Sequence, residues 1–292
     1  MKKFQNKANT KSIDTNNIGK LISIFEQNSW EISEDEYTNG IFNDFCKMLN
    51  MYNEEQQELI LELTKNYLWV GVQNYFQHIT SLFKTISEDQ SKEHTNIKTI
   101  FVIPLVAEKD IGKAKSSISL TYMIKGFVVF LEKMFEGKKI VIQDNYDYII
   151  DNIDKLKKTK ILLVDDYVGT GDTAESAILY LEGKGIERKK LTVATLVSQE
   201  DGYQKIIGLD VEVYYSKLRK KGISDYYTDE NASEMFRVMD TIEEQIGVFP
   251  EYKYGYKHSE ALVTMTRTPN NTFPVFWLES KRVPVVPFAR RG

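Results

Sequence analysis

The sequence is poor in the residues that build disulfide frameworks and metal clusters. It contains one cysteine, Cys46, and three histidines. A single cysteine cannot form an internal disulfide, which is typical of proteins kept in a reducing compartment. The histidines, His78, His94 and His258, are scattered and stand at no zinc-ligand spacing. The composition therefore argues against a disulfide scaffold and against a histidine–cysteine metal site.

Long apolar runs and a strong excess of one charge are also missing. No run reaches the roughly 20 apolar residues of a membrane-spanning helix, and the polar N-terminus lacks the apolar core of a signal peptide. The formal net charge of −4 gives no global attraction to nucleic acid. With 42% hydrophobic and 27% charged residues, the chain has a globular composition. We expect a cytoplasmic protein without a membrane partner.

The N-terminal part of the chain has helical periodicity up to about Ile86. Its clearest helix is predicted to begin at Asn53, a good N-cap that is followed by acidic residues. Apolar residues then recur at helical spacing: Leu59, Ile60, Leu63, Tyr67 and Val70. A polar stretch, Ser87–Asn96, predicts a linker. We therefore predict an N-terminal helical region over residues 1–96 and a second domain over residues 97–292.

Short apolar strands alternate with helices after Ile97. The predicted strands are Thr99–Leu105, Lys139–Gln143, Lys160–Val164, Leu191–Val197 and Val211–Tyr215, and helices are predicted at Ser116–Met134 and Thr173–Leu181. Strands that are apolar on both faces and are joined through helices indicate a parallel sheet covered by helices. We predict an α/β fold of this kind.

The sequence from Asp225 onward has a different texture. A helix is predicted near Ser233–Ile246, and Tyr252, Tyr254 and Tyr256 then alternate like one face of a strand. Such tyrosines can stack on a nucleobase, although packing in the core or at the surface is the simpler interpretation. We predict a small C-terminal lobe on the sheet.

The segment with the clearest chemistry runs from Asp165 to Thr173. A buried strand ends in two acids, and charged groups at the carboxyl edge of a parallel sheet stand where ligands bind. Gly169 and Gly171 then permit backbone conformations that are closed to other residues. Thr170 and Thr173 add hydroxyl donors, and the free amides at the start of the next helix form an anion site. The pattern predicts a phosphate-binding loop with two carboxylates beside it.

This segment resembles the phosphoribosyl pyrophosphate (PRPP) signature of type I phosphoribosyltransferases: four apolar residues, two acids and a short loop ending in Thr-Gly-x-Thr. The resemblance implies that Asp165 and Asp166 hold the ribose hydroxyls, directly or through Mg²⁺, and act as the catalytic and metal-binding residues. It also implies that the 5-phosphate is wrapped by Gly169, Thr170, Gly171, Asp172 and Thr173. An alternative interpretation, in which the acids only cap a helix or the loop binds a different phosphate, stays open.

Two residues depart from the family pattern. Tyr167 stands where a small aliphatic residue is usual, and Gly169 stands where purine-salvage members often have an aspartate that manages a proton on the base. A reaction of the hypoxanthine–guanine type is therefore disfavoured. A member that recognises its acceptor elsewhere, or that has lost turnover, stays possible.

The other parts of the family site have weaker counterparts. The pyrophosphate loop would be Ala107–Ser117, where Gly112 and Lys113 are candidate anion-binding residues; a solvated loop is an equal alternative. The mobile catalytic loop has no clear counterpart: its only candidate, Asp144–Lys158, has mostly the pattern of an acidic helix or turn followed by a basic end. A basic run after the last predicted strand stands where relatives contact pyrophosphate or base, although a charged surface is favoured: Lys217, Arg219, Lys220 and Lys221.

The helical leader and the stretch Arg267–Trp277 resemble the phosphoribosyltransferase-like effectors of bacterial anti-phage systems, including retrons. That resemblance implies an effector restrained by partners. Three hypotheses follow: a Mg²⁺-dependent phosphoribosyltransferase, a module that senses PRPP or a nucleotide, and an assembly protein that holds a protein or nucleic-acid partner. The third would use a basic tail: Lys281, Arg282, Arg290 and Arg291.

Overall fold

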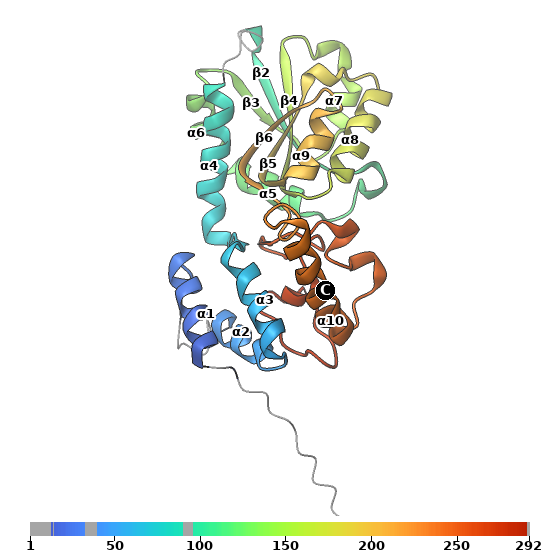
Figure 1. Ribbon diagram of the computed structural model, residues 1–292. Helices are drawn as coiled ribbons and strands as arrows, with labels where there is room; N and C mark the ends of the chain where they lie inside the picture. The colour runs from blue at the N-terminus through green and yellow to red at the C-terminus, as the bar shows by residue number, and fades with distance from the viewer. Residues whose placement is uncertain (1–12, 14, 33–39, 90–95, 291–292) are drawn as a thin grey trace, which may run out of the picture. The chain divides into compact units, whose positions relative to one another are not determined.

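The computed structural model describes residue 13 and residues 15–32, 40–89 and 96–290, which form two compact units (Figure 1). The first unit combines the described residues up to Trp69 with those from Lys221 onward, and the second unit spans Val70–Lys220. The boundary predicted from the sequence lay between residues 96 and 97. In the structure the chain instead enters the second unit at Val70 and returns to the first at Lys221. Among the described residues, no helix has both the length and the apolar character to cross a membrane.

The second unit is built on a five-stranded sheet. Its strands are β2 (Thr99–Pro104), β3 (Lys139–Ile142), β4 (Thr159–Val168), β5 (Leu191–Gln199) and β6 (Glu212–Arg219). They lie in the order β3-β2-β4-β5-β6, and every neighbouring pair is parallel. The predicted parallel α/β sheet is confirmed, with β4, β5 and β6 each running further toward the carboxyl edge than predicted.

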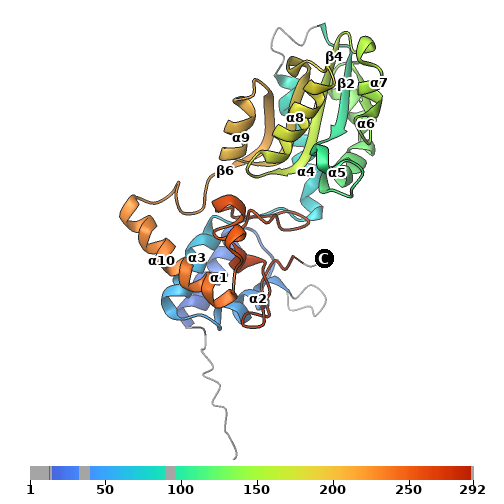
Figure 2. The same cartoon turned by 90° about the vertical axis from the view of Figure 1, so that its right-hand side faces the viewer.

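Helices cover both faces of this sheet (Figure 2). They are α4 (Val72–Glu88), α5 (Ser116–Lys125), α6 (Val128–Met134), α7 (Asp147–Asp151), α8 (Asp172–Gly183) and α9 (Glu200–Ile207), with short 3-10 turns at Glu108–Asp110, Ile153–Lys155 and Arg188–Lys190. Ile161 and Leu163 of β4 share one hydrophobic core with Ile178 of α8 and Ile206 of α9. The helix predicted over Ser116–Met134 is interrupted at Phe127, whose φ of −112° and ψ of 5° leave helical geometry.

The strand order creates a switch point between β2 and β4. The chain goes from β2 to β3 on one side, then returns to β4 on the other side and continues outward to β5 and β6. In doubly wound sheets of this order, the crossovers diverge at that point and open a crevice at the carboxyl ends of the two strands. The loop after Pro104 and the loop after Val168 both begin there.

The first unit combines described segments from the N-terminal and C-terminal parts of the sequence in one hydrophobic core. Its helices are α1 (Thr15–Gln27), α2 (Ile41–Leu49), α3 (Glu54–Lys65) and α10 (Asp229–Ile246), and β1 (Leu68–Trp69) pairs in parallel with β7 (Val263–Thr264). The ring of Tyr67 stacks on that of Phe288 with 4.8 Å between centroids. The predicted leader and the predicted C-terminal lobe therefore build a single body.

Two local predictions in the first unit have opposite outcomes. Helix α3 begins as predicted: Asn53 accepts a hydrogen bond from the amide of Gln56, and the Gln56 side chain accepts one from the amide of Asn53. The expectation that the alternating tyrosines form a strand is wrong. They lie around the 3-10 turns Pro250–Tyr252 and Tyr256–His258, and Tyr254 has a φ of 54°. A last 3-10 turn spans Pro274–Phe276.

A buried carboxyl group in the first unit makes a prediction about pH. The Glu243 side chain is 4% exposed. Its Oε1 accepts a hydrogen bond from the Tyr254 amide at 2.9 Å, whereas its Oε2 has no partner in the described part of the chain. Burial raises the pKa of Glu243 from 4.5 to about 8. Because the folded state holds this proton more tightly than the unfolded state, stability falls as the pH rises from 4.5 through about 8.

We therefore expect Glu243→Gln to remove a pH-dependent loss of stability. Urea unfolding of the wild type and the variant at pH 5 and at pH 9 measures this effect. The gap in unfolding free energy should widen with pH in favour of the variant, by at most about 1.4 kcal/mol per pH unit. Equal pH profiles for the two proteins would contradict the raised pKa.

Candidate functional site

The predicted acid pair lies at the switch point, inside the last part of strand β4. Asp165 pairs with Thr195 of β5, and the strand continues through Asp166 to Val168. The strand predicted from the sequence ended at Val164, whereas β4 runs on to Val168. The backbone is still extended there, so the two side chains start from opposite faces of the sheet.

Asp165 is half-buried at the edge of the sheet. Its Oδ1 accepts hydrogen bonds from the amide of Asp166 at 2.9 Å and from the hydroxyl of Ser116 at 3.2 Å. The pKa of Asp165 is raised well above its usual range, first by desolvation and then by the negative charge of Asp166. Strongly shifted carboxyl groups at a sheet edge are typical of functional sites.

Asp166 has a different environment, because its side chain is only 5% exposed. Its Oδ2 accepts a hydrogen bond of 2.8 Å from the hydroxyl of Tyr75 on α4. The two acids that the sequence assigned to a sugar therefore differ in burial: Asp165 is half-buried at the sheet edge, and Asp166 is almost fully buried. Tyr75 was not singled out in the sequence.

The loop after β4 has the backbone that an anion site requires. Gly171 has a φ of 78° and is the N-cap of α8. In the described part of the chain, the amides of Thr170, Gly171 and Thr173 donate to no protein acceptor. Free amides at a helix N-terminus, reinforced by the helix dipole, favour a bound phosphate or carboxylate.

Glycine on a neighbouring helix allows this loop its path. Gly202 of α9 lies so close that a Cβ atom on it would stand 2.3 Å from the carbonyl oxygen of Gly169 and 2.9 Å from Cγ1 of Val168. A Cβ on Gly171 would meet the Gly202 backbone at 3.1 Å. The loop and the start of α9 therefore pack backbone against backbone, which only glycine permits.

A lysine of α9 holds the acidic side chains at the start of α8. Lys205 Nζ lies 2.7 Å from Asp172 Oδ1 and also pairs with Glu175. Its hydrogen bond to Asp172 is the main reason that the pKa of Lys205 is raised. Asp172, which the sequence assigned to the phosphate, has its carboxylate bound to this lysine. No helix was predicted over α9 from the sequence, so Gly202 and Lys205 were not among the candidate residues.

The predicted pyrophosphate loop also reaches the switch point. Gly112 has a φ of 83°. Lys113 and Lys115 both pair with Asp110, at 2.9 and 2.8 Å, and these bonds lower the pKa of Asp110 to about 2. Gly112 and Lys113 line a cavity of about 380 Å³ together with residues that follow β3, including Tyr146. The loop ends at Ser116, which contacts Asp165.

The remaining candidates form no further site in the described residues. Lys217 and Arg219 lie at the carboxyl end of β6, in register with Val197 and Gln199. His78 contacts the Ser216 hydroxyl at 2.9 Å, and His94 lies outside the described residues. Among those residues, no group of three or more acidic, histidine or cysteine side chains is arranged to hold a metal ion alone.

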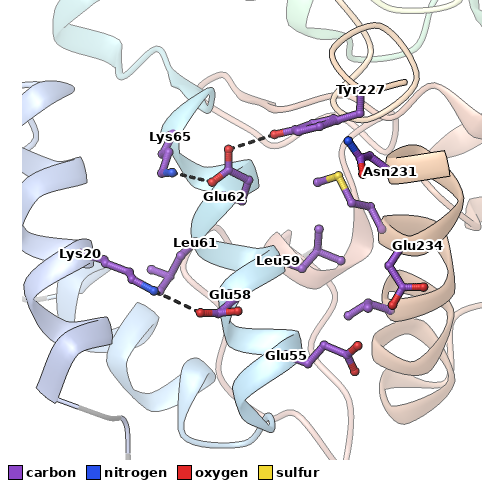
Figure 3. A pocket seen from close by; sticks show the side chains of 12 residues that line it. Lys20, Glu55, Glu58, Leu59, Leu61, Glu62, Lys65, Tyr227, Asn231 and Glu234 are labelled. Carbon is purple, nitrogen blue, oxygen red and sulfur yellow. Dashed lines mark hydrogen bonds and ion pairs between the residues drawn. The ribbon is translucent and has the colours of Figure 1, made fainter. Parts of the chain in front are cut away.

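A pocket of about 510 Å³ lies in the first unit, between α3 and α10 (Figure 3). Its apolar wall includes Leu59 and Val238. The acids at its rim are paired with nearby bases: Glu58 with Lys20 at 3.3 Å, and Glu62 with Lys65 at 2.5 Å. No chemistry was predicted for this pocket from the sequence. The ion pairs at its rim neutralise these acids, so they give no indication of a ligand.

Several solved structures are similar to this chain at low identity. HGPRT-ase from Leishmania tarentolae, in complex with GMP, is 16% identical, with 52% of this chain and 80% of that chain covered and a TM-score of 0.34. Orotate phosphoribosyltransferase from Aeropyrum pernix is 15% identical, with 60% and 77% covered and a TM-score of 0.30. A hypothetical protein from Neisseria gonorrhoeae with bound ppGpp is 12% identical, with 60% and 97% covered and a TM-score of 0.32.

Likenesses of this degree carry no argument about function. No curated protein matches the chain. The family comparison is decisive instead, because one family model, described as PRTase-CE, matches residues 48–291 and so spans most of the sequence. The chain belongs to the PRTase-CE family.

Proposed function

We propose that the chain binds PRPP at the switch point between β2 and β4 and transfers or cleaves its ribose 5-phosphate group at the anomeric carbon. The observation that carries the proposal is the set of uncommitted amides at Thr170, Gly171 and Thr173, next to the half-buried Asp165. The amides suit a phosphate, and a carboxylate beside them suits the hydroxyls of the attached sugar.

The reaction would break the bond between the anomeric carbon and pyrophosphate. Positive charge develops on the sugar as this bond lengthens, and the carboxylates of Asp165 and Asp166 would stabilise that charge. The amides of the loop would hold the 5-phosphate still, so that the reacting carbon keeps its place. An acceptor base, or water, would then attack the same carbon.

The acid pair also fits Mg²⁺ by its donor chemistry. Hydrogen bonds engage Asp165 Oδ1 and Asp166 Oδ2, and the two carboxylates lie close enough to interact with each other. Oxygen donors are what Mg²⁺ prefers, and it binds through one or two carboxylates together with substrate phosphates. When bound, the ion would neutralise charge on the leaving pyrophosphate. Asp165 and Asp166 are the residues that would hold it.

Two observations favour a second function, the sensing of PRPP or a nucleotide without turnover. Gly169 supplies no carboxylate for a proton on the base. The only candidate for a mobile catalytic loop, Asp144–Lys158, contains α7 and a 3-10 turn, in agreement with its helix-or-turn pattern. On the sequence resemblance to conflict-system effectors, we also propose a role in anti-phage defence with a protein or nucleic-acid partner.

Thermal unfolding with PRPP and Mg²⁺ tests the binding that both functions require. A ligand present at about 100 times its dissociation constant stabilises the folded state by about 2.7 kcal/mol, so we expect a rise of several degrees in Tm. No rise at millimolar PRPP would contradict both functions. A rise with pyrophosphate release, over a panel of bases and with water alone, supports the enzyme, and a rise without release supports the sensor.

A further inference from the structure

One member of the acid pair, Asp166, forms a buried contact with Tyr75. The Tyr75 side chain is 3% exposed and that of Asp166 is 5% exposed. The hydroxyl donates to the carboxylate at 2.8 Å across 91 positions of sequence. A hydrogen bond to a charged acceptor is stronger than one between neutral groups, and more so away from water.

The position of the hydroxyl on its helix indicates a specific purpose. The buried face of α4 consists of Tyr75, Ile79, Leu82 and Phe83, at the spacing of a packing stripe. Only Tyr75, in the first turn, has a polar group on this stripe, and that group meets the carboxyl end of β4. Packing alone needs no hydroxyl there, and a buried one requires a partner.

The contact continues through the backbone to the half-buried Asp165. The amide of Asp166, whose side chain Tyr75 holds, donates to Asp165 Oδ1 at 2.9 Å, and Ser116 donates to the same oxygen. A shift of Asp166 would therefore move the donor that orients Asp165. Outer hydrogen-bond partners of this kind set the direction of the groups that touch a ligand.

We infer that Tyr75 is a positioning residue, which fixes Asp166 and, through its amide, aims Asp165 at the ribose hydroxyls. This inference rests on the proposed function, because it concerns the same sugar site. Tyr75 itself touches no substrate. Removal of the Tyr75 hydroxyl should therefore weaken sugar binding, although every group proposed to contact the ligand is still present.

Tyr75→Phe tests the inference, because it deletes the hydroxyl and keeps the ring. Tyr67→Phe is a matched control: Tyr67 is also 3% exposed, and its hydroxyl lies 2.6 Å from that of Thr264 in the first unit. The affinity for ribose 5-phosphate in Mg²⁺-free buffer is measured by calorimetry for both variants. We expect about a tenfold loss for Tyr75→Phe, the lower end for outer-partner variants, and no loss for Tyr67→Phe.

A double-mutant cycle with Asp166→Asn tests whether Tyr75 acts through Asp166. If it does, Tyr75→Phe costs far less affinity in the Asp166→Asn background than in the wild type. Equal costs in both backgrounds, equal losses for the two tyrosine variants, or wild-type affinity for Tyr75→Phe would each overturn the inference. If the wild type binds neither ribose 5-phosphate nor PRPP, the proposed function fails and the inference fails with it.

Discussion

Replacing both Asp165 and Asp166 by asparagine is expected to abolish turnover of PRPP and to weaken its binding at least about a hundredfold. The double variant removes both charges that would stabilise the developing positive charge on the sugar, and losses of this size follow from removing such groups. Pyrophosphate release and calorimetric titration of PRPP measure the two effects. Asp210→Asn, at an exposed position in the turn before β6 of the same unit, is the control and should behave as the wild type.

The same substitution should leave the fold intact, and at neutral pH Asp165→Asn alone should raise the thermal stability. Since the folded state holds the Asp165 proton more tightly than the unfolded state does, stability declines as the pH rises above about 4, where an unfolded aspartate ionises. The asparagine variant escapes that decline. Melting curves in Mg²⁺-free buffer at pH 5 and pH 8 measure it. If the double variant of Asp165 and Asp166 binds PRPP like the wild type, the assignment of the sugar site is refuted.

The second large effect is expected at Gly202, a residue that touches no ligand. In Gly202→Ala, the new methyl group would lie 2.3 Å from the carbonyl oxygen of Gly169. One of the two backbones must move, which typically costs about 1–3 kcal/mol and sometimes more. The moved backbone is the proposed phosphate-binding loop, so affinity for ribose 5-phosphate should fall together with stability. Denaturant unfolding and calorimetry measure the two losses.

Gly183→Ala is the matched control for this change. Gly183 lies at the end of α8, and a Cβ atom there would meet nothing within 4 Å. Alanine also has the higher helix propensity, by up to about 1 kcal/mol. We therefore expect unchanged or slightly raised stability and normal binding. A Gly202→Ala variant as stable as Gly183→Ala would show that the loop and α9 do not pack as closely as described.

Much of the second unit could be predicted from sequence because its signals are local. Apolar runs of strand length, separated by helical segments, located all five strands of the sheet. The acid pair, the loop glycines and the helix start are adjacent in the chain, so one segment contains most of the proposed phosphate site. The capping box at Asn53 and Gln56 is likewise a pattern of neighbours.

What could not be predicted depends on contacts between distant segments. The partner of Asp166 is Tyr75, on a helix that the periodicity marked only as a packing element. Lys205 is one of many charged residues until α9 brings it to Asp172. The alternating tyrosines suggested a strand, but backbone turns at Tyr254 and its neighbours place them otherwise. No local pattern states which tyrosine faces a carboxylate.

The interrupted path of the chain through the first unit also orders its biosynthesis. Synthesis from the N-terminus delivers α1, α2 and α3 first, then all of residues 70–220, and only afterwards the strand and rings that complete the core around Tyr67 and Phe288. Contacts of such long sequence separation form slowly, and a nascent chain folds in the order in which its parts emerge. Residues 70–220 can therefore fold on the ribosome while the leading helices still expose the apolar surface that the later segment covers.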